Sequence, residues 1–233
     1  MKGYSQFCPV AKGAEVFNER WTPLIIREMM CGSTRFNDLK RGNPMMSPSL
    51  LSQRLKFLEE AGVIEKIVGD DDSTEYLLTP SGRDLGEIVV RLGLWGQKWA
   101  RSRLTEEDYD PQLLMWDMRR RIDASRFPQS RIVIGFMFRD MPSSKRAYWL
   151  IVDQGDVDLC IKYPGFEVDL EFVTTSRTMA DIWMGYTTIR QAGRSGKLLL
   201  NGSKSLISSI DDWFGYGFFA NTDEVESALT PAE

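Results

Sequence analysis

Apolar residues recur at helical spacing in three successive segments near the start of the chain. They occupy positions 24, 25, 26, 29 and 30 in the first segment, 36 and 39 in the second, and 51, 55 and 58 in the third. Thr22, Thr34 and Ser47 stand where these segments begin and are expected to cap the helices, with Pro23 and Pro48 at the first helical turn. The pattern predicts three helices, and a short turn joins the second to the third as in a helix-turn-helix.

The apolar pattern changes after Gly62. Residues 63–68 and 75–78 are typical of two β-strands, and the short polar segment 69–74 joins them. A β-hairpin that follows a helix-turn-helix directly is a wing.

A longer helix is predicted from Thr79-Pro80 onward. Its apolar positions are Leu85, Ile88, Val89, Leu92, Trp95 and Trp99. We expect Leu92, Trp95 and Trp99 to pack against a second copy of the chain. Two weak binding sites joined in one dimer bind a partner more tightly than either site alone. Packing within its own domain is the alternative.

The second half of the chain is rich in β-forming residues. A helix is predicted at 111–123, and four runs at 131–139, 146–153, 157–163 and 167–175 read as strands of an antiparallel meander. Helical segments at 178–193, a short strand near 196–203 and a helix at 204–210 follow. Strands followed by helices predict an α+β domain with an antiparallel sheet.

Length and charge divide the chain in two. The 233 residues suffice for two cores, and net charge is +2 over residues 1–105 but −6 over residues 106–233. The polar, acidic stretch 102–111 ends in proline. We therefore predict a mainly α winged helix-turn-helix domain at 1–105, for DNA binding and dimerisation, and an α+β domain at 110–233.

Composition narrows the chemistry. The chain has no histidine and only three cysteines, Cys8, Cys31 and Cys160. Histidine-based catalysis and a four-ligand zinc site are therefore excluded, and we expect no cofactor and no metal. Because the apolar runs are too short to span a bilayer and no signal peptide is visible, we expect no membrane contact and a cytoplasmic location.

One side of the predicted helix 48–60 is suited to DNA. Ser49, Ser52, Gln53 and Lys56 share a face, where hydroxyl and amide groups fit base edges. Arg54 and Lys56 lie near its margins, where they would reach phosphates. The predicted DNA-binding set is Ser47, Ser49, Ser52, Gln53, Arg54, Lys56 and Arg35. A merely solvated helix face is the alternative, but the adjoining wing favours DNA.

The first half resembles a known family. The segments CPVAKGAEVFNERWTPLIIREM, RFNDLKR, MSPSLLSQRLKFLEEAGVIEK, YLLTPSGRDL and LGLWGQKW are similar, in order, to those of the HxlR-type winged helix-turn-helix regulators, which are related to the MarR group. The resemblance implies a homodimeric transcription factor whose recognition helix is residues 48–60. At the wing tip, however, Asp70, Asp71 and Asp72 would repel phosphates.

The same resemblance raises a redox hypothesis. Some members of the family sense oxidants or electrophiles through a cysteine near the N-terminus, and Cys8 matches that position. The resemblance thus implies a thiol switch at Cys8. An inert thiol is the alternative.

The second half is similar to the sterol-carrier-protein-like domain, above all in KLLLNGSKSLISSI. That resemblance implies a cavity for a small apolar ligand between sheet and helices. The residues expected to line it are Phe136, Phe138, Trp149, Met179, Trp183, Met184 and Trp213. Plain core packing is the alternative.

Three functions follow from these patterns. The first is a DNA-binding regulator, not an enzyme, whose second domain senses a ligand. The second is a DNA-binding module fused to an enzyme domain, which the missing histidine disfavours. In the third, the second domain only clamps the dimer.

Overall fold

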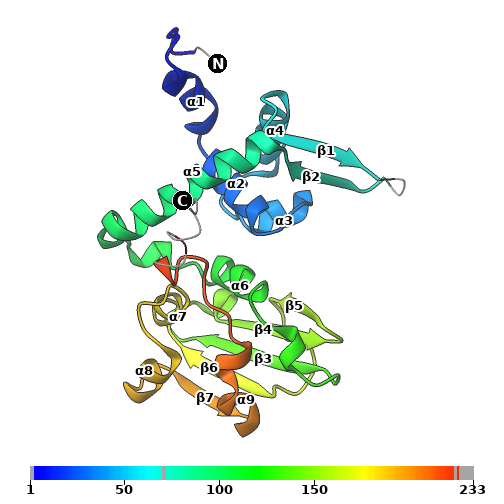
Figure 1. Ribbon diagram of the computed structural model, residues 1–233. Coiled ribbons are helices and arrows are strands. Elements are labelled where there is room, and N and C mark those ends of the chain that lie inside the picture. Colours follow the sequence, from blue (N-terminus) through cyan, green and yellow to red (C-terminus); the bar gives the residue numbers. More distant parts are fainter. Residues whose placement is uncertain (1–2, 70–71, 223–224, 226–233) are drawn as a thin grey trace, which may run out of the picture. The chain divides into compact units, whose positions relative to one another are not determined.

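The computed structural model describes residues 3–69, 72–222 and 225, and the chain divides into two compact units, Met1–Arg101 and Ser102–Glu233. Figure 1 labels their elements. Among the described residues, no helix combines the length and the apolar character needed to cross a membrane.

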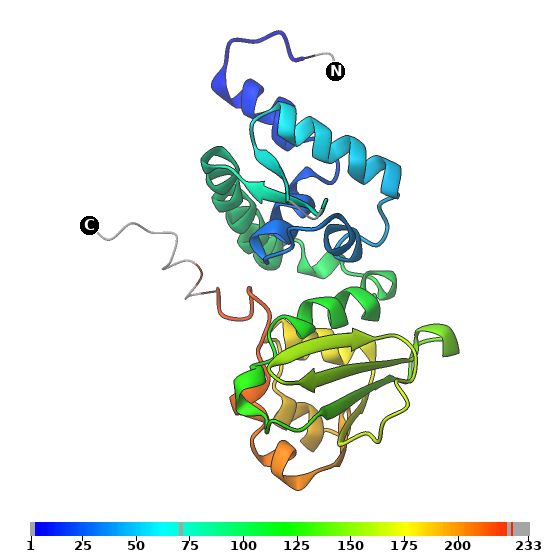
Figure 2. The ribbon, with the colours of Figure 1, turned by 90° about the vertical axis from the view of Figure 1, so that its right-hand side faces the viewer.

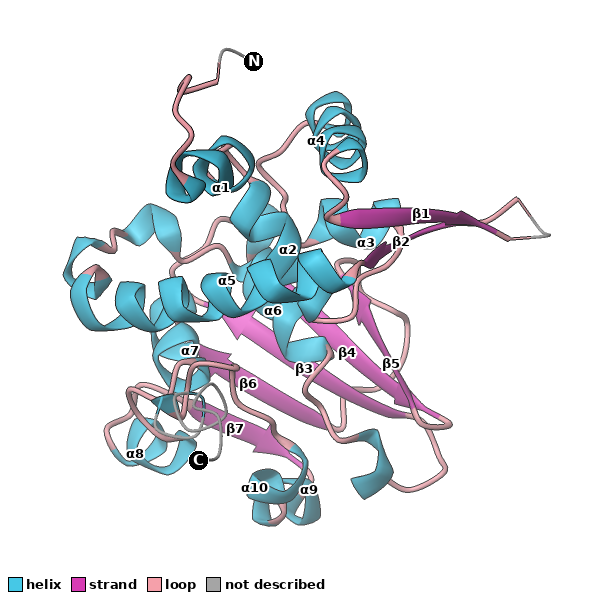
Figure 3. Ribbon diagram, turned by 45° about the horizontal axis from the view of Figure 1, so that its top comes forward, coloured by secondary structure: helices cyan, strands magenta, loops and turns pink. Residues whose placement is uncertain are grey.

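The first unit is a winged helix-turn-helix. Its elements are α1 (Pro9–Phe17), α2 (Thr22–Met30), α3 (Phe36–Arg41), α4 (Pro48–Glu60), β1 (Ile64–Val68), β2 (Thr74–Leu78) and α5 (Pro80–Trp99). The antiparallel hairpin β1–β2 pairs Ile64 with Leu78 and Val68 with Thr74, and it extends away from the helices in Figure 3. The predicted helices and wing are confirmed.

The start signals are confirmed in part. Ser47 Oγ accepts a hydrogen bond from Leu50 N, and Thr79 Oγ1 accepts one from Gly82 N, as N-cap side chains do. Thr22 is instead the first residue of α2, because Trp21 holds the N-cap position in the left-handed conformation with φ 80°. Arg35, not Thr34, precedes α3, since the carbonyl of Thr34 accepts Tyr76 N from the wing.

The core of the first unit joins α2, α3, α4, the wing and α5. Its fully buried members include Ile25, Ile26, Leu39, Met46, Leu51, Leu55, Leu58 and Ile64. The members on α2, α3 and α4 follow the helical spacing of the sequence, whereas Met46 lies in the turn before α4 and Ile64 on β1.

The second unit contains helices packed on a mixed sheet. Its elements are α6 (Pro111–Arg119), β3 (Ile132–Phe138), β4 (Ala147–Asp153), β5 (Asp156–Cys160), β6 (Leu170–Thr174), α7 (Ser176–Trp183), α8 (Ile189–Arg194), β7 (Leu199–Gly202), α9 (Lys204–Ser208) and α10 (Ile210–Trp213), with short 3₁₀ turns between some of them. Helix α6 ends before the predicted residue 123, since Asp123 N donates to Trp213 O.

The predicted antiparallel meander is wrong. The strand order is β5-β4-β3-β6-β7, and β6 runs parallel to β3, with Phe136 opposite Phe172. β3 is almost wholly buried and takes the centre of the sheet, as its unbroken apolar run indicates. β5, with exposed Asp156 and Asp158, lies at an edge. The other three strand pairings are antiparallel.

The core of this unit lies on one side of the sheet. Alternate residues of β3, β4 and β6 meet side chains from α6, α7, α8, α9 and α10. The ribbon in Figure 2 shows the course of the sheet and of these helices. Phe136 stacks on Phe172 with ring centroids 4.7 Å apart.

Gly202, the last residue of β7, lies close to the backbone at the start of β6. Its φ is 126°, and a Cβ there would collide with the carbonyl oxygen of Asp169. We expect Gly202→Ala to lower the free energy of unfolding by about 2 kcal/mol or more. Gly193→Ala, in α8 with open space around the new Cβ, should leave it unchanged or raise it by up to about 1 kcal/mol. Urea unfolding followed by tryptophan fluorescence measures both, and equal midpoints would contradict this account.

Candidate nucleic-acid interface

Helix α4 is anchored through one side and open on the other. Leu51, Leu55 and Leu58 are buried in the core of the first unit. Ser49, Ser52, Gln53 and Lys56 are all exposed, so the structure brings these four predicted residues onto one free face. This face offers the donors and acceptors that base edges require.

The hydroxyl groups of α4 also make internal bonds. Ser47 Oγ lies 3.2 Å from Ser49 Oγ as well as accepting Leu50 N, and Ser52 Oγ donates to Pro48 O at 3.1 Å. Of the four side chains on this face, Gln53 is the one that ends in an amide, which is suited to bidentate contact with a base.

The structure does not bring Arg54 to the exposed face. Its guanidinium lies 2.6 Å from Glu19 Oε2, and only 17% of the side chain is exposed. Arg54 comes directly before Leu55, which directs it to the flank of α4, toward the α1–α2 connection. It ties the helix to its own domain, a role that depends on a tertiary partner and has no signal in the local sequence.

Arg35 lies beside the wing rather than on α4. Arg35 forms an isolated bridge with Glu75 of β2, and their side chains pair at 3.5 Å. Thr34 Oγ1 also donates to Glu75, at 3.4 Å. The start of α3 is thus joined to the hairpin, and Arg35 keeps 63% of its side chain exposed.

Carboxylates accompany two further cations of this region, Lys56 and Arg41. Lys56 Nζ lies 3.8 Å from Glu60 Oε1, and Arg41 Nη1 lies 3.3 Å from Asp38 Oδ1. Exposed ion pairs of this kind contribute at most about 1 kcal/mol, so a phosphate can compete for the cation. At these two pairs the charge of the cation is offset by a carboxylate until a partner competes for it.

Glu28 is a buried carboxylate that the sequence pattern did not single out. It accepts a hydrogen bond from Ser33 Oγ at 2.8 Å and faces Arg27 Nη2 at 3.4 Å, while Arg27 also donates to the carbonyl of Gly42. A Cβ on Gly42 would collide with this carboxylate. The cluster holds the α3–α4 turn against α2, and no local pattern in the sequence could have revealed it.

The wing presents the exposed cation Lys66, which suits a phosphate backbone, beside exposed apolar residues of β1. Ile67 and Val68 are exposed on β1, and Asp72 has φ 60°. Asp70 and Asp71, the other two carboxylates of the predicted tip, lie outside the described residues.

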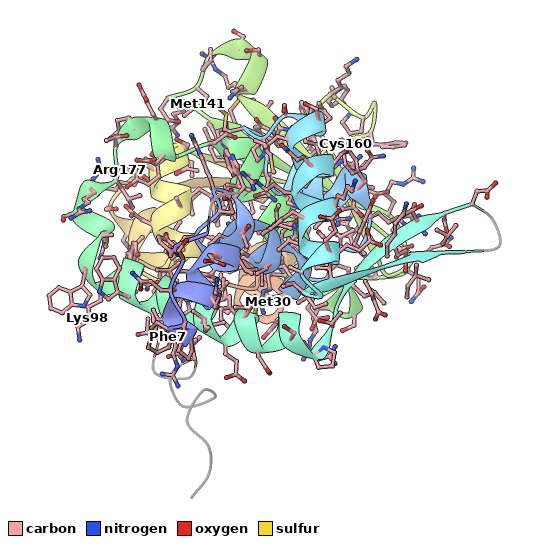
Figure 4. All side chains as sticks on the ribbon, turned by 90° about the horizontal axis from the view of Figure 1, so that it is seen from above. Phe7, Met30, Lys98, Met141, Cys160 and Arg177 are labelled. Carbon is pink, nitrogen blue, oxygen red and sulfur yellow. The ribbon has the colours of Figure 1, made fainter. Side chains whose placement is uncertain are left out.

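The last helix of the first unit presents an apolar stripe. Leu92, Trp95 and Trp99 are 46%, 54% and 61% exposed, so their own domain does not bury them. Lys98 Nζ lies 5.3 Å from the ring centre of Trp99, and Figure 4 shows Lys98 pointing away from the ribbon. Phe7 and Val10 add exposed apolar surface at α1.

The cysteines lie in different environments. Cys8 is the N-cap residue of α1 and is partly buried, and Lys12 one turn later pairs with Glu15 at 3.0 Å. Hydrogen bonds from Lys12 and Tyr4 N lower the pKa of Glu15. Burial and the nearby Asp158 raise the pKa of Cys160 on β5, which disfavours the reactive thiolate there. The thiol switch at Cys8 stays a prediction.

Six of the seven predicted ligand-pocket residues gather in or at the core of the second unit. Phe136, Phe138, Met179, Trp183 and Trp213 are buried there, and Met184 packs at the edge. Trp149 is not with them: it alternates with buried Tyr148 and Leu150 and contacts Tyr163 on the other side of the sheet, at 5.7 Å between ring centres. Apolar ligand binding stays a prediction.

Comparison with known proteins places the likeness in the first unit. The model of the HxlR-like helix-turn-helix family matches residues 16–104. The HTH-type transcriptional regulator YvaP of Bacillus subtilis (strain 168) is 34% identical over 98 residues, which are 41% of this chain and 91% of that protein. An HTH-type regulator of Mycobacterium tuberculosis (strain ATCC 25618 / H37Rv) is 39% identical over 92 residues, 39% of this chain and 58% of that protein.

Solved structures match the same share of the chain. The redox regulator HypR in its reduced form has a TM-score of 0.39 and 28% identity, and the match covers 41% of this chain and 97% of that one.

The Arg54–Glu19 pair yields a stability prediction. Arg54→Met leaves Glu19, itself 24% exposed, without its cation, and we expect the free energy of unfolding to fall by about 1–3 kcal/mol. Lys56→Met is the matched control, because its pair with Glu60 is exposed and should matter by less than about 0.5 kcal/mol. Adding Glu19→Gln to Arg54→Met should recover part of the loss. Equal urea midpoints for Arg54→Met and Lys56→Met would refute the anchoring role.

Proposed function

The chain belongs to the HxlR-like helix-turn-helix family, and on this basis we propose that it is a transcriptional regulator that binds double-stranded operator DNA as a homodimer. The observation that carries the proposal is the exposed face of Ser49, Ser52, Gln53 and Lys56 on a helix fixed by three buried leucines. A rigid helix with a free polar face suits the major groove.

Base reading in this proposal depends on few groups. Gln53 pairs with a base edge, Ser49 and Ser52 offer hydroxyl oxygens, and Lys56 reaches a phosphate after release from Glu60. Because Arg35, Arg41 and Lys56 are paired with carboxylates, their contribution to nonspecific attraction to DNA is reduced. Selectivity then comes from the base contacts.

A second copy of the chain is the proposed occupant of the apolar stripe on α5. Leu92, Trp95, Gly96 and Trp99 recur at helical spacing, and a Cβ on Gly96 would meet open space, so another helix has room to approach. Two half-sites on one operator compensate for a weak single contact. In such a dimer the recognition helices would lie one DNA turn apart, roughly 34 Å.

For the second unit we propose a regulatory role through a small apolar ligand, since all but its first three residues lie beyond the family match and it has its own core. An enzyme fused to the DNA-binding unit has less support, because the chain lacks histidine and the matched relatives are regulators. A clamp for the dimer is the remaining alternative.

DNA binding is tested by selecting duplexes from a random library with the full chain and measuring affinity by fluorescence anisotropy. Gln53→Ala should weaken discrimination against single base changes by about 1–3 kcal/mol. Glu60→Gln should tighten binding to all duplexes because it frees Lys56. Glu59→Gln on the same helix is the control with an equal change of charge. No enrichment of any duplex, even at low salt, would refute the proposal.

Dimerisation is tested by light scattering over a range of concentrations. The wild type should have twice the mass of one chain, and Trp95→Glu should move it toward the mass of one chain. Ile161→Glu, at an apolar residue of the second unit that is 61% exposed, should leave the mass unchanged. A wild type with the mass of a single chain at every concentration would exclude the homodimer.

A further inference from the structure

The turn between α3 and α4 directs two adjacent methionines in opposite directions. Met46 is 1% exposed and belongs to the core, whereas Met45 is 83% exposed. Met45 lies two residues before Ser47, the N-cap residue of α4, and the connection can be followed in Figure 1. The apolar side chain of Met45 is thus exposed to solvent next to the N-terminus of α4.

This turn is held in place by side chains from both helices that precede it. Asn43 Nδ2 donates to Leu39 O at 3.0 Å, Lys40 Nζ donates to Pro44 O at 3.0 Å, and Arg27 Nη2 donates to Gly42 O at 3.1 Å. Met46 N donates to Asn43 O as well, at 3.0 Å. The backbone therefore presents Met45 in a defined position, and only its unbranched side chain has freedom to adapt.

The polar groups at the same end of α4 are partly engaged within the protein. Ser52 Oγ uses its proton on Pro48 O, and Ser47 and Ser49 share one between their hydroxyl groups. Few hydroxyl donors are left there for base edges. The exposed groups that remain beside them are apolar, the side chains of Met45 and Pro48.

The chemistry of thymine fits this end of the helix. In the major groove thymine offers one acceptor, O4, and the C5-methyl group, which pairs with apolar side chains. In complexes of helix-turn-helix proteins with DNA, the N-terminal residues of the recognition helix, here α4, contact the base edges. We propose that Met45 is a specificity-determining residue that packs against the C5-methyl group of a thymine in each operator half-site. This inference rests on the proposed function.

Deoxyuridine gives a clean test, because it differs from thymidine only by that methyl group. Starting from a duplex that the wild-type chain selects, each thymidine of a half-site is replaced singly and affinity is measured by anisotropy. At one position at least, the wild type should lose about three- to five-fold in affinity, the effect of exposing one buried methyl group. Met45→Ala should lose a similar factor on the original duplex and should not distinguish the two bases at that position.

Two variants separate readout from a structural effect. Met45→Leu keeps an apolar contact and should retain the preference for thymine, whereas Met45→Gln, of similar length but polar, should lose it. All three variants should unfold in urea like the wild type, since the side chain lies in solvent. A wild type that binds a selected duplex yet tolerates deoxyuridine everywhere, or a Met45→Ala that keeps the thymine preference, would overturn this inference alone. Failure of the wild type to select any duplex would instead overturn the proposed function.

Discussion

The burial of Leu51, Leu55 and Leu58 is the contact on which the DNA-binding unit depends. These three side chains fix the rotation of α4 about its own axis, because a turn of one residue would carry a leucine into water and a serine into the core. Fully burying a leucine contributes about 1.5–3 kcal/mol, so the three together outweigh any single polar contact of the unit. The free polar face is a consequence of that rotation.

The same rotation determines what each neighbouring residue can do. Arg54 lies on the flank of the buried stripe and pairs with Glu19, so a cation that composition alone would assign to phosphate binding serves the domain instead. Ser47 occupies a capping position and its oxygen is partly used there. Fewer polar groups of α4 are therefore available to contact DNA than the number of its polar residues suggests.

Much of the first unit could be predicted because its signals are local. Spacing identified α2, α3, α4 and α5, and Ser47-Pro48 and Thr79-Pro80 identified two helix starts. The signal at Thr22 failed because Trp21 adopts a left-handed conformation that bulky residues rarely take. The polar face of α4 could be read from its sequence, but the Glu28 cluster and the Arg54 pair could not, because they join residues distant in the sequence.

In the second unit the strands were predictable and their partners were not. Four of the strands were expected from β-forming runs, and the fifth from a short strand near the end of the unit. The order of strands in a sheet depends on which strand tolerates burial on both faces at the centre. The continuous run IVIGFMF of β3 carries that signal, and an antiparallel meander overlooks it by placing β3 at an edge. The aromatic residues show a similar limit. Phe136 as a lining residue and Phe136 as core look alike in sequence, and its stacking on Phe172 means that a ligand entering there must replace a ring contact already made.

In the proposed homodimer, the apolar stripe on α5 would supplement a DNA-binding face on which several cations are already paired with carboxylates. Each exposed ion pair in the interface must be exchanged for a phosphate contact, and such exchanges gain little because the cation already has a partner. A single unit would then hold DNA weakly and release it quickly. In the proposed homodimer, pairing two copies through Leu92, Trp95 and Trp99 would make the second contact intramolecular, which would raise affinity without any added positive charge. The ion pairs of the interface and the pairing through α5 would then complement each other in this proposed homodimer, because discrimination between sequences would not have to overcome a large charge-driven background.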